Sequence, residues 1–154
     1  MKILAIDPGT ATGGWAFVED GVLVDSGHWA GRGLTFRLPD DVLRMVIFLK
    51  PDIVVVERYI TYNGAKEESQ AVAEVVGAIL YGVQSIRGAT KAVCVPYATW
   101  AGWWRQFELK QLLDSGTKDF LHIDNEHERD AAKMALGYYF VSAHKRSKKE
   151  DDHV

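Results

Sequence analysis

Asp52-Ile53-Val54-Val55-Val56-Glu57 is the segment most informative about the fold, because it places a run of β-branched residues between two carboxylates. A continuous apolar run of this length, without alternating polar residues, is typical of a strand buried on both faces. Strands of that kind belong to sheets that carry helices on both sides. The segments on either side of this run then decide which strands and helices surround it.

Three strands are predicted ahead of it. Lys2–Asp7 is a short apolar run, and Gly13–Glu19 alternates between apolar and polar residues. The turn signal Glu19-Asp20-Gly21 follows, and Val22–Ala30 returns as a third strand. These three segments predict an antiparallel arrangement.

Helical periodicity marks the segments between and after the strands. Gly31–Leu38 is expected to be a loop, and a helix is predicted from Pro39 to Leu49. A long helix is predicted over Lys66–Ser85, and a final one from about Asn125 to Ala143. Lys91–Val95 is predicted to be a fifth strand.

The predicted order β-β-β-α-β-α-β-α favours an α/β fold with a mixed five-stranded sheet, three antiparallel strands plus two parallel strands, and helices on both faces. Residues 1–145 are expected to form a single domain, followed by a charged, flexible tail over 146–154. Trp100, Trp103 and Trp104 share one helical face, which is typical of a core or dimer contact rather than a DNA platform.

Composition places the chain among soluble globular proteins. Its 154 residues are 47% hydrophobic and 25% charged, which excludes disorder and a coiled coil. No apolar run approaches the ~20 residues of a membrane helix. The single cysteine, Cys94, is expected to be a buried thiol in a reducing compartment, so a cytoplasmic location is predicted. The net charge of −3 neither supports nor excludes nucleic-acid binding.

Three acidic residues lie next to apolar segments that are predicted to be buried, where a charged side chain is unfavourable. Asp7 ends the first strand, Glu57 ends the buried strand, and Asp130 lies inside the final helix. Asp7 and Glu57 would lie side by side if their strands are neighbours, and like charges there favour a divalent ion such as Mg²⁺ or Mn²⁺. His127 shares a helix face with Asp130, because the two are three residues apart.

Each of these residues also has a structural interpretation. Asp7 before Pro-Gly is able to open a turn, Glu57 to pair with Arg58, and Asp130 to pair with Arg129 or Lys133. Near the start of the final helix, Asp124 or Asn125 is a good N-cap, and Asn125 with Glu128 resembles a capping box. That interpretation accounts for Asp124, Asn125 and Glu128, and Glu126 is set aside with them. It leaves His127 and Asp130 as candidate ligands.

Three motifs together resemble the RuvC-type Holliday junction resolvases, which are small endonucleases with an RNase H fold. The motifs are Ile6-Asp7-Pro8-Gly9-Thr10, Pro51–Glu57 and His127-Glu128-Arg129-Asp130-Ala131-Ala132, in that order over nearly the whole chain. The resemblance implies a crossover junction endodeoxyribonuclease that acts in DNA recombination and repair. It also implies a homodimer in a bacterial cytoplasm or a phage-infected host cell, with branched DNA as the partner and no membrane.

The resemblance further implies a two-metal mechanism. Two Mg²⁺ ions roughly 4 Å apart, which Mn²⁺ would replace, clamp the scissile phosphate in such a mechanism. Asp7 would bridge both ions, Glu57 would bind one, and Asp130, with or without His127, would bind the other. In-line attack by water would leave 5′-phosphate and 3′-hydroxyl ends.

The DNA contacts expected from the resemblance are matched less completely in this sequence than the metal ligands are. Tyr59 and Tyr62 flank the position at which the family places an aromatic wedge, and either one is a candidate for stacking on a base. The segment before the final helix is shorter and less basic than in the family, a departure that bears on junction specificity more than on the cleavage chemistry. The candidate basic contacts are Arg58, Lys66, Arg105, Lys110 and Lys118.

Three alternative functions stay open. One is a broader debranching nuclease that cuts forks and flaps. A second is the related family of RNase H-fold nucleases that process ribosomal RNA, although its characteristic Asp-Glu-Arg-Leu-Ser/Thr stretch has no counterpart here. The third is a non-catalytic module that binds branched nucleic acid; retention of Asp7, Glu57 and Asp130 argues against it.

Overall fold

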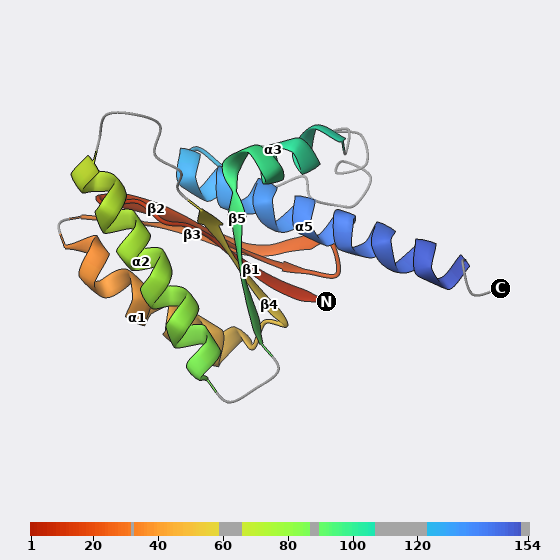
Figure 1. The fold of residues 1–154 in the computed structure, drawn as a ribbon, viewed down its shortest axis with the longest axis horizontal. Helices are drawn as coiled ribbons and strands as arrows, with labels where there is room; N and C mark the ends of the chain where they lie inside the picture. The colour runs from red at the N-terminus through yellow and green to blue at the C-terminus, as the bar shows by residue number, and fades with distance from the viewer. Residues whose placement is uncertain (32, 59–65, 87–89, 107–122, 152–154) are drawn as a thin grey trace.

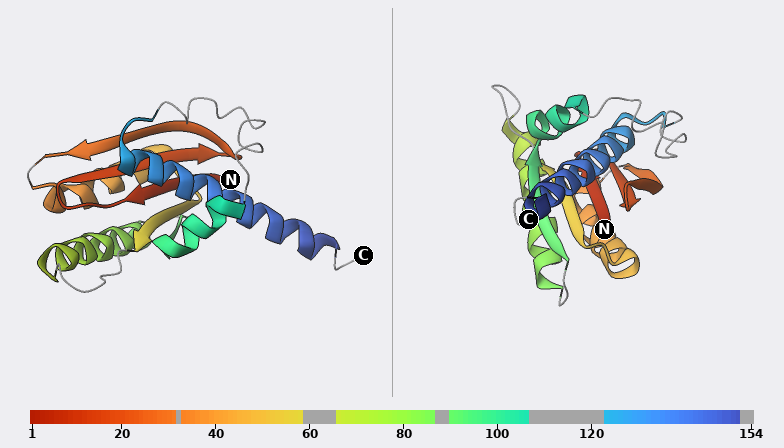
Figure 2. Two further views of the ribbon diagram at one scale, coloured as in Figure 1. Left: turned by 90° about the horizontal axis from the view of Figure 1, so that it is seen from above. Right: turned by 90° about the vertical axis from the view of Figure 1, so that its right-hand side faces the viewer.

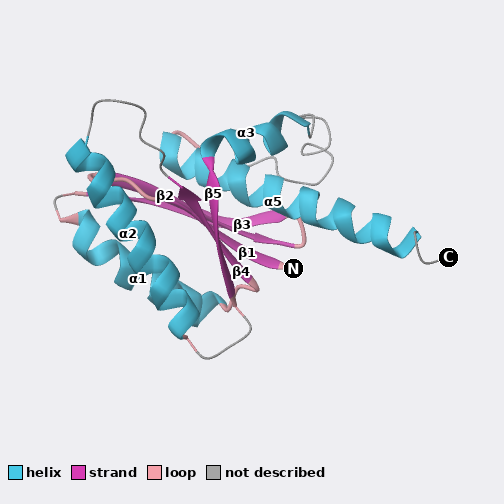
Figure 3. Ribbon diagram, in the orientation of Figure 1, coloured by secondary structure: helices cyan, strands magenta, loops and turns pink. Residues whose placement is uncertain are grey.

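A five-stranded sheet in the order β3-β2-β1-β4-β5 forms the centre of the molecule (Figure 3). The computed structural model describes residues 1–31, 33–58, 66–86, 90–106 and 123–151. The strands are β1 (Lys2–Asp7), β2 (Thr12–Glu19), β3 (Val22–Ala30), β4 (Ile53–Arg58) and β5 (Lys91–Pro96).

The sheet is mixed, as the sequence predicts. β1 pairs antiparallel with β2, and β2 pairs antiparallel with β3. β4 lies parallel to both β1 and β5. The structure therefore confirms the predicted α/β class with three antiparallel and two parallel strands.

Helices cover both faces of this sheet (Figures 1 and 2). On one face, α1 (Leu34–Leu49) and α2 (Lys66–Ser85) pack over alternate residues of β1 and β4. On the other face, α3 (Tyr97–Gln106) and α5 (Glu126–Asp151) pack over the intervening residues. Val54, Val55 and Val56 are completely buried, which confirms that this run is covered on both sides.

Two helix boundaries differ from the prediction. α1 begins at Leu34 rather than Pro39, so the predicted loop over Gly31–Leu38 is wrong for its second half. Leu34 and Leu38 are fully buried and extend the apolar stripe, and this burial offsets the backbone hydrogen bond that Pro39 removes from inside the helix.

α5 runs on to Asp151, so its predicted end at Ala143 is wrong (Figure 2). Residues 146–151 of the predicted tail are helical in the structure. Lys, Arg and Glu are good helix formers, so the helix is able to continue without an apolar stripe. The sequence prediction relied on that stripe and therefore ended the helix too early.

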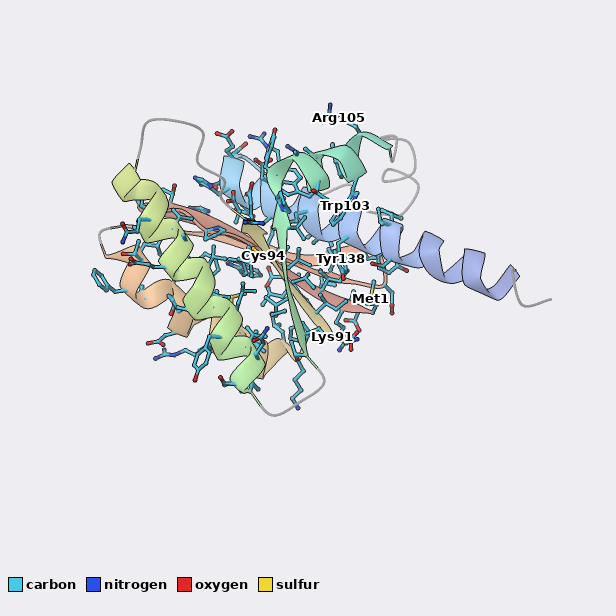
Figure 4. All side chains as sticks on the ribbon, in the orientation of Figure 1. Met1, Lys91, Cys94, Trp103, Arg105 and Tyr138 are labelled. Carbon is cyan, nitrogen blue, oxygen red and sulfur yellow. The ribbon has the colours of Figure 1, made fainter. Side chains whose placement is uncertain are left out.

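The tryptophans of α3 contribute to the core. Trp100 is 3% exposed, and Trp103 and Trp104 pack against the buried residues on the same side of the sheet. Trp103 meets Tyr138 of α5 edge to face, with ring centroids 5.7 Å apart (Figure 4). Cys94 is only partly buried, less than predicted. No helix in the described ranges is long and apolar enough to cross a membrane.

Candidate active site

Asp7 and Glu57 lie at the carboxyl ends of neighbouring parallel strands. The register pairs Ile6 of β1 with Val56 of β4, so the two acidic residues that follow are adjacent. Every second residue of a strand points to the same face of the sheet. Ile3, Ala5 and Val55 pack in the core beneath α5, so Asp7 and Glu57, which follow them at this spacing, also point to the face that α5 covers. Asp7 is 8% exposed. The predicted juxtaposition of these carboxylates is confirmed.

The first turns of α5 bring His127 and Asp130 to the same place. The Nδ1 atom of His127 lies 2.8 Å from Oδ2 of Asp7, which accepts a hydrogen bond from the ring. The helix approaches the sheet very closely at Gly14, where an added Cβ would lie 2.1 Å from the carbonyl carbon of His127. Only glycine at this position allows that approach.

These residues line one open pocket of about 340 Å³. All four residues predicted from the sequence contribute to it, together with Val72 of α2 and the loop that follows β1. Glu126, which the capping interpretation set aside, lines the pocket too. Its spacing of four residues from Asp130 was the signal that pointed to it. The residues that line the pocket are Asp7, Pro8, Gly9, Thr10, Ala11, Thr12, Glu57, Val72, Glu126, His127 and Asp130.

Burial and neighbouring acidic groups make ionisation of Glu57 in this pocket unfavourable. Burial, together with the neighbouring carboxylate of Asp7, raises the pKa of Glu57 to about 8. The buried indole N–H of Trp100 lies close enough to lower this pKa, although it does not reach hydrogen-bonding geometry with any partner in the described residues. Glu57 therefore keeps its proton to an unusually high pH when no cation is bound.

The same carboxylates also raise the pKa of His127. Its hydrogen bond to Asp7 raises the pKa of the imidazole, and Glu126 and Asp130 add to this effect, while burial opposes it. The imidazolium form is thus favoured beside the carboxylates.

Asp130 has two sets of neighbours. It lines the pocket, and its Oδ1 atom lies 2.8 Å from Nζ of Lys133. The ion pair with Lys133 that the structural interpretation offered is therefore present, alongside the position in the pocket. Asn125 caps α5 as predicted, since its Oδ1 accepts from the backbone N–H of Glu128 at 3.1 Å.

The donor chemistry of this pocket fits a hard divalent ion. Asp7, Glu57 and Asp130 supply carboxylate oxygens, and His127 supplies an imidazole nitrogen. In the described part of the chain, however, no three histidine, cysteine or acidic side chains are already arranged to hold a metal ion. Rotation of these side chains would be needed to gather the ligands.

The predicted DNA contacts are only partly described by the structure. Arg58 at the end of β4 and Arg105 on α3 are exposed, and neither lines the pocket. Lys66 is the first residue of α2. Tyr59, Tyr62, Lys110 and Lys118 lie outside the described residues.

The pKa of Glu57 leads to a prediction about stability. In the unfolded chain this group loses its proton near 4.5, but in the folded, metal-free protein it does so near 8. The folded state therefore holds an extra proton between these values, and its contribution to stability falls as the pH rises through that window. In EDTA, melting temperatures of the wild type should decline from about pH 5 to pH 8 more steeply than those of Glu57→Gln. Parallel melting curves for the two proteins would contradict the assignment.

No protein-family profile matches this sequence, and no curated protein matches it either. Solved structures do match. RuvC of T. thermophilus in complex with a Holliday junction substrate superposes with a TM-score of 0.73 at 17% identity, over 93% of this chain and 96% of that one. The yeast mitochondrial Holliday junction resolvase gives 0.60 at 14% identity, over 89% and 77%. The fowlpox virus resolvase bound to Holliday junction DNA gives 0.52 at 14%, over 93% and 98%.

Sheet order and helix placement thus define an α/β protein with the RNase H-like fold. The chain shares this fold with RuvC and other Holliday junction resolvases, as the sequence motifs predicted.

Proposed function

We propose that this protein is a divalent-metal-dependent, structure-selective DNA endonuclease that resolves four-way junctions by paired symmetric nicks. One observation carries the proposal: Asp7, Glu57, His127 and Asp130, from three separate elements, line a single open pocket at the carboxyl edge of the sheet. The fold shared with structures described as junction resolvases supports it.

Asp7, Glu57 and Asp130, with His127, would hold the metal. Two Mg²⁺ ions, or Mn²⁺ in their place, would supply positive charge for the scissile phosphate and lower the pKa of an attacking water. A phosphodiester is an anion, so the carboxylates of this pocket would repel it in the absence of cations. The chain's own contribution is to hold these oxygens on rigid strand ends and to leave the pocket open to the DNA backbone.

We further propose that the enzyme acts as a homodimer, because two symmetric cuts in a four-way junction match a C2 dimer. The outer face of α2 supports this choice. Ala73, Gly77 and Ala78 are exposed on it beside Tyr81, which is 76% exposed. Small residues with one exposed aromatic side chain would let a second copy approach closely.

Gly77→Glu is expected to weaken this dimer. A Cβ at this position meets no atom within 4 Å in the protomer, and glycine disfavours a helix, so the substitution should not harm folding. Analytical ultracentrifugation should show a shift toward monomer, and cleavage should change from paired to single nicks. Gln84→Glu adds the same charge to the exposed end of α2 and serves as the control. Unchanged dimerisation in Gly77→Glu would exclude this surface.

A cleavage assay tests the function itself. Labelled four-way junction, fork, flap, linear duplex, RNA–DNA hybrid and structured RNA would be incubated with Mg²⁺, with Mn²⁺ or with EDTA. The expected result is paired symmetric nicks in the junction, lost in EDTA, with 5′-phosphate and 3′-hydroxyl ends that DNA ligase is able to seal.

The other outcomes separate the alternatives. Equal cleavage of forks and flaps would favour a general debranching nuclease. Cleavage confined to RNA would favour an RNA-processing enzyme. Tight junction binding without metal-dependent cleavage of any substrate would favour a binding module and overturn the proposal.

A further inference from the structure

A row of residues crosses the sheet beneath the first turn of α5. The strand register places Asp7 of β1 opposite Gly14 of β2, and Gly14 opposite His28 of β3. Directly paired residues point to the same face, so these three positions all face α5. The helix backbone rests on the middle of the row, at Gly14.

α5 makes side-chain contacts at both ends of this row. At one end, His127 hydrogen-bonds Asp7. At the other end, Glu128 contacts the edge strand: the hydroxyl of Ser26 donates to its Oε1 at 2.7 Å, and Nδ1 of His28 lies 3.3 Å from its Oε2. The Glu128 side chain is 16% exposed and that of His28 is 48% exposed, so the contact with Ser26 is the more shielded of the two.

We propose that Glu128 is a positioning residue: with Ser26 and His28 it clamps the first turn of α5 to β3 and thereby sets where His127 and Asp130 stand relative to Asp7 and Glu57. The capping interpretation assigned Glu128 to the helix terminus, but its carboxylate reaches the edge strand instead. The clamp gives β3, which contributes no residue to the pocket, an influence on the site.

The physical reason is that the other side-chain contact of this turn, between His127 and Asp7, involves two of the proposed metal ligands. A metal ion would compete for the Asp7 carboxylate that accepts this hydrogen bond, so this contact is less suited than the clamp to hold the helix in place during catalysis. The clamp lies outside the pocket and stays intact when the ligands rotate. This inference rests on the proposed function for its catalytic consequence, but not for the clamp itself.

The test compares Glu128→Ala with Glu128→Gln. Glutamine retains an oxygen that accepts from Ser26 and gains an N–H that donates to His28, so it should preserve the clamp. For Glu128→Ala we expect a fall of roughly tenfold to a hundredfold in kcat for junction cleavage, because small displacements of reacting groups are costly. KM for the junction should change little, and Glu128→Gln should restore most of the rate.

Two further measurements do not depend on cleavage. Calorimetry with Mn²⁺ alone should show weaker binding to Glu128→Ala than to wild type. Hydrogen exchange should show faster exchange at the amides of Glu128 and Arg129, both of which bond to Asn125, without a change in the middle of α5. The double variant Ser26→Ala/His28→Ala should match Glu128→Ala, and combining all three changes should add little more.

Thr90→Val is the matched control. It removes a partly buried hydrogen bond of similar kind, from Thr90 to the carbonyl of Pro51 at 2.7 Å, at the opposite edge of the sheet. It should lower the melting temperature without changing kcat or Mn²⁺ affinity. The clamp is overturned if Glu128→Ala behaves like Thr90→Val, or if its effects simply add to those of the Ser26 and His28 changes. If wild type cuts no DNA, the proposed function fails, while hydrogen exchange still decides the clamp.

Discussion

Asp7→Asn is expected to lower metal-dependent junction cleavage by roughly a thousandfold or more. Asp7 is the most buried of the pocket's acidic groups, and it contacts both Glu57 and His127. Asparagine has the same shape and accepts the same hydrogen bond from His127, but it lacks the charge that a divalent ion needs. Initial rates on a labelled four-way junction, under saturating Mg²⁺, measure the loss.

Stability should move in the other direction. Above about pH 8, where Glu57 is ionised in the metal-free protein, removing one of the crowded carboxylates relieves repulsion, so the melting temperature of Asp7→Asn in EDTA should equal or exceed that of wild type. Mg²⁺ should raise the melting temperature of wild type and not that of the variant. Asp52→Asn, at the amino end of β4 where its carboxylate accepts from the backbone of Lys2, is the control and should cleave normally. Full activity in Asp7→Asn would refute the assigned role.

Gly14→Ala is expected to have the second largest effect. The added methyl group would lie 2.1 Å from the carbonyl carbon of His127 and 2.3 Å from the backbone nitrogen of Glu128. These are backbone atoms, so no side-chain rotation relieves the clash, and α5 must move away from the sheet. We expect a loss of about 1–3 kcal/mol in the free energy of unfolding. Junction cleavage should fall at temperatures well below the melting point, because His127 and Asp130 move with the helix.

Gly102→Ala on α3 provides the comparison. Its Cβ would meet no atom within 4 Å, and alanine favours a helix over glycine, so it should leave stability unchanged or raise it by up to about 1 kcal/mol. Urea unfolding of both variants gives the difference directly. Equal stability for Gly14→Ala and Gly102→Ala would show that the close approach of α5 to β2 does not constrain the site.

Local patterns in the sequence determined most of the fold. The β-branched run before Glu57 required a doubly covered strand, and the spacing of valines in Lys66–Ser85 predicted α2 with its observed bounds. These features depend on residues close in the chain, which is why they were predictable. The boundaries that failed, at Leu34 and Asp151, are places where burial or intrinsic propensity overrode the local stop signals.

The candidate site was predictable as a set of residues and not as an arrangement. Strand ends and helix spacing identified Asp7, Glu57, His127 and Asp130, because a buried carboxylate is unfavourable unless it is paired with a cation. Glu126 was set aside because a helix N-terminus accounts for acidic residues as well as a pocket does.

How these residues meet depends on contacts between segments that are far apart in the sequence. The parallel register of β1 and β4 sets Asp7 beside Glu57, and the absence of a side chain at Gly14 lets α5 bring His127 within 2.8 Å of Asp7. The contact of Glu128 with Ser26 and His28 joins residues about a hundred positions apart. The amino-acid sequence establishes which chemical groups are present and which segments form helices and strands, because residue type and the local spacing of apolar residues can be read from it directly. Which of these groups share a pocket depends on how segments far apart in the sequence pack against one another, and local sequence patterns do not specify that packing.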